Sequence, residues 1–145
     1  MAQEERERVL VGVDGSEASI RALRWAMRYA ERTGAVIEAV HVWQVPTTYG
    51  SPVKAVPGEN FAETGERALN ETVDHELAGR KDLEVRRIAQ GGHPSDVMVE
   101  RSRSADLLVV GSRGQGGLKG ALLGSVSLRC VTHAACPVVV IRAED

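Results

Sequence analysis

The sequence predicts an α/β fold, with residues 1–145 forming a single domain around an open, twisted, five-stranded parallel sheet that carries helices on both faces. Three observations support this prediction. Five short runs of β-branched and aliphatic residues are typical of strands buried on both faces. Stretches with helical spacing alternate with these runs. The length of 145 residues, with 43% hydrophobic and 26% charged residues, suits one globular core.

The first forty or so residues predict a strand, a helix and a second strand. Residues 8–13 form an almost continuous apolar run that ends at an Asp-Gly-Ser turn. Ser16 is the expected N-cap of the following helix, because its side chain can accept a hydrogen bond from the first turn. Gly34 is its expected C′ residue. The second strand then covers residues 36–42, and the crossover between the two strands should be right-handed.

The rest of the chain continues the alternation after an irregular segment. Residues 43–60 contain three prolines and two glycines and are expected to form a loop. The remaining predicted elements are a helix over 61–79, a strand over 83–89, a helix over 94–103, a strand over 106–110, a helix over 125–134 and a strand over 137–141. The last strand is short, apolar and expected at an edge of the sheet.

Composition excludes several classes of protein. The formal charge of −2 predicts no general attraction to nucleic acid or to anionic membranes. The charged N-terminus and the short apolar runs indicate neither export nor a membrane span, so we expect a cytoplasmic protein. Cys130 and Cys136 flank His133 at a spacing that matches no common zinc pattern, and both are interpreted as packing residues. His41, His75 and His93 form no ligand set or triad and are interpreted as structural.

The segment from Gly111 to Ser127 is the part of the sequence that predicts chemistry. It contains six glycines and directly follows the fourth predicted strand. Glycines allow backbone N–H groups to converge on an anion, and the helix that follows offers its unpaired N-terminal N–H groups, so phosphate is the expected ligand. Two better-known phosphate motifs are absent. Lys119 precedes Gly120 instead of following a P-loop glycine, and it replaces the third glycine of the dinucleotide fingerprint.

The spacing Gly-x-x-Gly-x9-Gly-Ser, formed by Gly111, Gly114, Gly124 and Ser125, resembles that of the ATP-binding universal stress proteins. The resemblance covers essentially the whole chain. It extends to Val-Leu-Val-Gly-Val-Asp-Gly-Ser near the start, His-Val in the second strand, Gly-His-Pro, Asp-Leu-Leu-Val-Val-Gly-Ser, and His-Ala-Ala-Cys-Pro-Val-Val-Val-Ile-Arg at the end. The family implies a Rossmann-like sheet with strand order 3-2-1-4-5, and a regulatory protein of the stress response that binds ATP, or alternatively ADP or AMP.

The same resemblance implies roles for individual residues. Asp14 would contact ribose or a phosphate-bound Mg²⁺, and Val42 would line the adenine pocket. Gly111 and Gly114 would contact ribose and phosphates through their backbone, while Gly124 to Ser127 would hold phosphates at the helix N-terminus. The full set of binding residues implied in this way is Gly12, Val13, Asp14, Val42, Val110, Gly111, Arg113, Gly114, Gly124, Ser125, Val126 and Ser127.

Alternatives remain for several of these predictions. Asp14 could instead form an Asx turn, Val42 could be only a core valine, and Arg113 and Lys119 could be solvated. No catalytic residue is predicted, because the glycine-rich segment lacks a carboxylate for a general base. A weak ATPase or phosphotransferase, and an interaction module that binds no ATP, are the alternative functions. The family also implies a homodimer formed through the strand Pro137 to Ile141.

Overall fold

The computed structural model describes residues 6–44, 47–48, 51–52, 60–113 and 123–142. Its main sheet contains five parallel strands in the order β5-β2-β1-β6-β7, which confirms the predicted order 3-2-1-4-5. The strands are β1 (Arg8–Gly12), β2 (Val36–Trp43), β3 (Thr47–Thr48), β4 (Ser51–Pro52), β5 (Val85–Gly91), β6 (Leu107–Gly111) and β7 (Val138–Ile141). The helices are α1 (Glu17–Thr33), α2 (Phe61–Leu77), α3 (Pro94–Ser102) and α4 (Ser125–His133).

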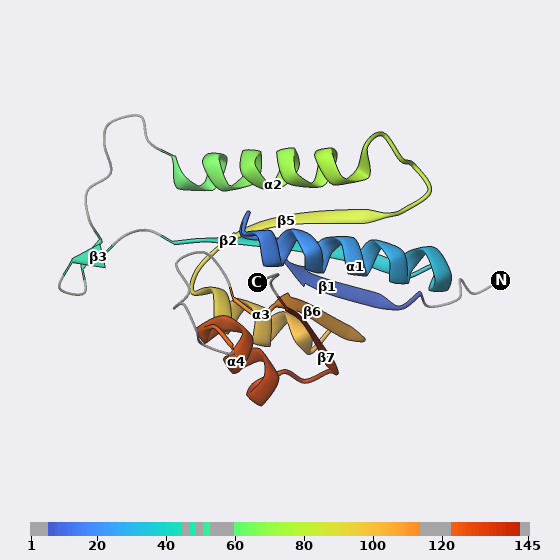
Figure 1. Cartoon of the computed structure of the whole chain (residues 1–145). Helices are drawn as coiled ribbons and strands as arrows, with labels where there is room; N and C mark the ends of the chain where they lie inside the picture. The colour runs from blue at the N-terminus through green and yellow to red at the C-terminus, as the bar shows by residue number, and fades with distance from the viewer. Residues whose placement is uncertain (1–5, 45–46, 49–50, 53–59, 114–122, 143–145) are drawn as a thin grey trace.

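Helices cover both faces of the sheet because its strand residues alternate between two apolar cores. Val9 and Val11 pack with α1 and α2, whereas Leu10 and its neighbour Leu108 pack with α3 and α4. Figure 1 shows this division, with α1 and α2 on one side of the strands and α3 and α4 on the other. All four of these strand residues are fully buried, and their backbone polar groups pair within the sheet.

Helix α1 begins and ends where its sequence predicts. The Oγ of Ser16 accepts a hydrogen bond from the Ser19 amide at 3.2 Å and so caps the first turn. Gly34 follows the last turn with φ 75°, and its amide donates to the Ala30 carbonyl. This left-handed conformation suits glycine because it has no Cβ. Local chemistry therefore sets both ends of the helix that packs over the centre of the sheet.

Several predicted bounds differ from the structure by one or two residues, and β5 and the segment 43–60 show the most informative differences. The third strand of the main sheet covers Val85–Gly91, two residues later than expected, because its pairing with β2 runs from Ile37–Val85 to Trp43–Gly91. A Cβ on Gly91 would lie 2.7 Å from Cη2 of Trp43, so glycine lets the two strand ends stay paired. The segment expected to be irregular contains β3 and β4, which pair antiparallel.

The surroundings of the two cysteines agree with their interpretation as packing residues. Cys130 is buried in the α3 and α4 core, Cys136 is half-buried, and both are free thiols. Burial raises the pKa of Cys130 to about 11, which keeps the thiol protonated and unreactive at neutral pH. On the other face, Arg24 of α1 donates two hydrogen bonds to Glu76 of α2. Among the described residues, no helix has the length and apolarity required to cross a bilayer.

Candidate nucleotide site

A cavity of about 480 Å³ lies at the carboxyl ends of the parallel strands. This is the edge where open α/β sheets bind ligands, and the volume falls in the range of small-molecule pockets. The cavity brings together segments that are more than one hundred residues apart in the sequence. The predicted binding residues that line it are Gly12, Val13, Asp14, Val42, Val110, Gly111, Arg113, Gly124, Ser125, Val126 and Ser127. Gly114 and Lys119 lie outside the described residues.

Asp14 lies in a tight turn between β1 and α1. Its Oδ1 accepts a hydrogen bond from the Ser16 amide at 2.9 Å, and its own amide donates to the Oγ of Ser19 at 3.2 Å. Gly15, between Asp14 and Ser16, has φ 82°. The Asx turn considered from the sequence is therefore formed, and the Asp14 side chain is exposed at the cavity. A carboxylate held in this way combines a structural bond with access to a ligand.

The N-terminus of α4 opens into the same cavity without a side-chain cap. Its N-cap is Gly124, and Ser125 is its first helical residue. An α-helix leaves its first N–H groups without intrahelical partners, and a glycine N-cap supplies no oxygen to accept from them. The hydroxyl of Ser127 is directed inward, to the carbonyls of Ser112 at 2.7 Å and Gly124 at 3.1 Å. Backbone N–H groups and the exposed Ser125 hydroxyl are thus the donors this end can offer to an anion.

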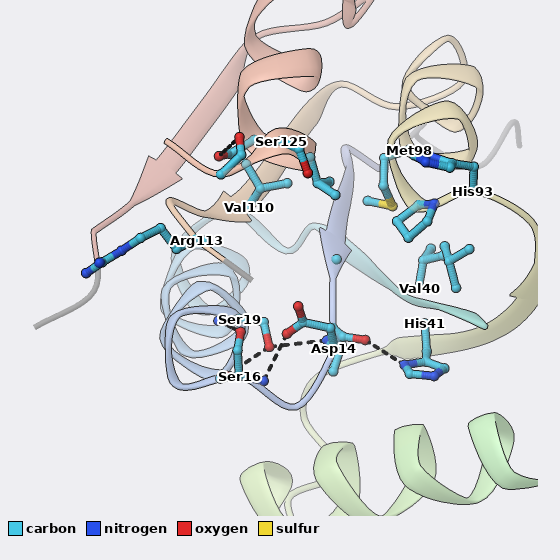
Figure 2. A pocket seen from close by; sticks show the side chains of 18 of the residues that line it. Asp14, Ser16, Ser19, Val40, His41, His93, Met98, Val110, Arg113 and Ser125 are labelled. Atoms are coloured by element: carbon cyan, nitrogen blue, oxygen red, sulfur yellow. Dashed lines mark hydrogen bonds between the residues drawn. The ribbon is translucent and has the colours of Figure 1, made fainter. Parts of the chain in front are cut away.

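An apolar wall completes the cavity. Val40 and Val42 of β2 and Met98 of α3 pack in the same core cluster and line the cavity together with Val110. Figure 2 shows Met98, Val40 and His93 grouped on one side, away from Ser16 and Ser19. Val42 therefore packs against the core and also lines the cavity, and its contact with an adenine ring stays a prediction. One end of the cavity suits a flat apolar ring and the other a polar, anionic group.

Arg113 lies at the margin of the cavity. It follows β6 and lines the cavity through part of its surface, while its side chain extends away from Asp14 and His41 (Figure 2). Gly111, at the end of β6, approaches α1 so closely that a Cβ there would lie 2.6 Å from the Cβ of Ala18. The charge expected from Arg113 near a phosphate stays a prediction.

Sequence reasoning did not select several residues that line the cavity. These are Ser16, Ser19, Val40, His41, Gln44, His93, Pro94 and Met98. Two signals could have identified some of them. Gln44 follows β2 directly and His93 follows β5 after one residue, so both occupy the strand ends where ligands bind. Met98 comes four residues after Pro94 on α3, which places both on one face of the helix.

Apart from histidines, Asp14 and Arg113 are the ionisable side chains among the described residues that line the cavity. Among the described residues that line it, Asp14 carries the one carboxylate, and one of its oxygens is engaged in the Asx turn. The described part of the chain contains no group of three His, Cys, Asp or Glu side chains that could hold a metal ion by itself.

Comparison with known proteins supports a family assignment. Residues 5–142 match the sequence model of the family described as the universal stress protein family. A universal stress protein of Mycobacterium tuberculosis is 41% identical over 139 residues, which cover 92% of this chain and 45% of that protein. The chain spans about half the length of the mycobacterial relatives that it matches.

Two solved structures with a similar fold contain an adenine nucleotide. A universal stress protein in complex with cAMP is 28% identical, with a TM-score of 0.68 over 94% of this chain and 97% of that chain. A universal stress protein family protein from Arabidopsis thaliana with AMP bound is also 28% identical, with a TM-score of 0.62 over 95% of this chain and 92% of that chain.

Proposed function

Because the chain belongs to the universal stress protein family, we propose that it binds ATP in the cavity at the carboxyl edge of its sheet. Occupancy by ATP, or by ADP or AMP, would make it a nucleotide-dependent regulatory protein of the stress response. The observation that carries the proposal is the pairing, within one cavity, of an apolar wall and an uncapped helix N-terminus. Relatives with bound AMP and cAMP support the choice of an adenine nucleotide.

The proposed orientation follows from the chemistry of the two ends. The adenine ring would lie against Val40, Val42 and Met98, where it loses contact with water. The phosphates would lie at Gly124 and Ser125. There they would accept hydrogen bonds from helix N–H groups that no cap side chain occupies. The ribose would lie between, beside the ends of β1 and β6.

Asp14 would contribute to Mg²⁺ binding through the nucleotide. Mg²⁺ in nucleotide sites takes one or two carboxylates, phosphate oxygens and water, so a single exposed carboxylate fits this role. The ion would neutralise phosphate charge beside the turn between β1 and α1. We propose a binding protein and not an enzyme, because no second carboxylate lines the described cavity. The proposed location is the cytoplasm, where its two free thiols would stay reduced.

Isothermal titration calorimetry with ATP and Mg²⁺ tests the proposal. We expect saturable binding of one nucleotide per chain. At a concentration one hundred times the Kd, ATP should stabilise the fold by about 2.7 kcal/mol, which a thermal melt can detect. Mass spectrometry of the nucleotide that co-purifies with the protein would show whether it retains ATP, ADP, AMP or a cyclic nucleotide. Absence of any measurable binding by the purified chain would overturn the proposal and favour an interaction module.

The enzyme alternative has its own measurement. We expect phosphate release from ATP to stay at the rate of a control without protein. Steady release above that control, abolished by Asp14→Ala, would show that the cavity catalyses hydrolysis and that Asp14 takes part.

We also propose a homodimer through the terminal strand, Pro137 to Ile141. The two edges of the main sheet differ in how they are protected. The outer strand β5 exposes Arg86 and Arg87, charges of the kind that prevent edge pairing. The other outer strand, β7, contains four half-buried apolar residues and no charge. A second copy pairing along β7 would cover this edge and form a two-fold interface.

Val140→Pro is the variant that tests this dimer. The carbonyls of Pro137 and Ile141 accept from the amides of Leu108 in β6 and of Ser112 just after it, so the alternating backbone turns the Val140 amide outward. Proline there removes an outward N–H and keeps the bonds to β6. Light scattering at micromolar concentration should give the mass of a dimer for the wild type and of a folded monomer for the variant. A monomeric wild type, or a variant that dimerises equally well, would contradict the proposal.

A further inference from the structure

The turn that carries Asp14 is attached to β2 through hydrogen bonds made by Val13. Inside the turn, residues 13–19, the bonds join Asp14 to Ser16 and Ser19. From outside, Nδ1 of His41 on β2 lies 2.9 Å from the carbonyl oxygen of Val13. Figure 2 draws this bond beside Asp14. The peptide between Val13 and Asp14 is thus the point where β2 contacts the turn.

The chemistry of this bond defines the state of the His41 ring. A carbonyl oxygen can only accept a hydrogen bond, so Nδ1 must carry the hydrogen. The neutral ring is then in its Nδ1–H form. Helix α2 passes close to the other side of the ring, where a Cβ on Gly65 would lie 3.0 Å from Cδ2 of His41 and 3.3 Å from Nε2. Because Gly65 has no side chain, there is room for the His41 ring between α2 and the turn.

The hydrogen bond from His41 joins β2 to the chain just after β1, where the backbone ladder between the two strands ends. Strand β1 pairs with β2 as far as Gly12, and the Val13 amide still donates to the Val40 carbonyl at 2.8 Å. The Val13 carbonyl lies beyond this ladder and takes its hydrogen bond from the His41 side chain. Both polar groups of Val13 are therefore attached to β2, and Asp14 is the next residue.

We propose that His41 is a positioning residue of the nucleotide site. Its Nδ1–H fixes the Val13–Asp14 peptide, and this peptide sets the direction of the Asp14 carboxylate toward the cavity. The effect on affinity rests on the proposed nucleotide binding. The ordering of the turn does not, because these bonds join groups of the chain itself.

Two substitutions of His41 separate the bond from the packing. His41→Asn keeps a donor where Nδ1 lies, and His41→Phe keeps a flat ring without a donor. We expect His41→Phe to speed hydrogen exchange of the Asp14 and Ser16 amides, and to weaken Mg·ATP binding, by about tenfold each, the effect of one hydrogen bond. His41→Asn should stay within about threefold of the wild type for both. His75→Phe makes the same change on an exposed surface of α2 and should alter neither.

The outcomes distinguish this inference from the proposed function. If His41→Phe leaves both exchange and affinity within about twofold of the wild type, or if a folded His41→Asn behaves like His41→Phe, the positioning role is wrong. If the wild type binds no nucleotide, the proposed function fails, and amide exchange alone decides the role of His41. Nitrogen-15 spectra of the wild-type histidines need no variant. In the neutral ring of His41, the Nδ1–H form supports the inference, and the Nε2–H form overturns it.

Discussion

Gly111→Ala is expected to destabilise the protein by about 3 kcal/mol, at the upper end of the cost of overpacking a core. An added Cβ would lie 2.6 Å from the Cβ of Ala18, 2.8 Å from its carbonyl carbon and 3.1 Å from its carbonyl oxygen. Two of these atoms belong to the backbone of α1, so rotation of a side chain cannot relieve the contact. Helix α1 would have to move away from the end of β6.

Gly12→Ala is the matched control. Gly12 ends β1, the strand next to β6, and it also lines the cavity. Its added Cβ would lie 3.5 Å from Cε and 3.9 Å from Sδ of Met98, which are ordinary contacts with the flexible end of a side chain. We expect a change below about 1 kcal/mol, because alanine also loses less conformational entropy than glycine in a strand.

Thermal and urea unfolding of the two variants measure the difference. For a chain of this size, 3 kcal/mol corresponds to a fall in Tm of roughly 6–12 °C. Equal stability of Gly111→Ala and Gly12→Ala would mean that α1 and β6 do not approach each other as described. The result would also bear on function, because α1 begins with the cavity residues Ser16 and Ser19.

Local chemistry explains why much of this fold could be predicted from the sequence. The ends of α1 depend on Ser16 and Gly34, whose preferences act over one helical turn. The strand order could not be derived from such signals and came from the family resemblance. The bounds of β5 also escaped prediction, because its pairing with the distant strand β2 sets them. The same limit applies to the pairing of β3 with β4.

The candidate site could also be predicted only in part from the sequence. The glycine and serine spacing around Gly124 and Ser125 is visible in the sequence because consecutive backbone groups form that end of the cavity. Spacing places His93 near a strand end and Met98 on the same helix face as Pro94, but the packing of α3 against β2 could not be derived from the sequence. His41 is the clearest case. It looked like a structural histidine, and its bond to Val13 became visible only when β1 and β2 were side by side.

Ser125→Glu should separate stability from nucleotide binding by moving them in opposite directions. Ser125 is exposed at the first position of α4, where a negative charge interacts favourably with the helix dipole and stabilises the helix by about 0.3–1 kcal/mol. The same charge would stand within several ångströms of the proposed phosphates. At the effective dielectric of a partly solvated site, this repulsion costs about 2 kcal/mol, or roughly a thirtyfold loss of ATP affinity.

Two comparisons make the Ser125→Glu experiment specific. Ser125→Gln removes the same hydroxyl and adds a similar side chain without charge, so it should bind ATP more tightly than Ser125→Glu, and the difference between the two affinities measures the repulsion. Adenosine has the base and ribose but no phosphate, so its affinity should be nearly equal in the wild type and in Ser125→Glu. The loss of ATP affinity should also shrink as salt is raised from 0.05 to about 0.5 M, because exposed charges are screened. Equal loss of adenosine and ATP affinity would place the phosphates away from α4, whereas selective loss of ATP affinity with a raised Tm is what an anion site at an uncapped helix N-terminus requires.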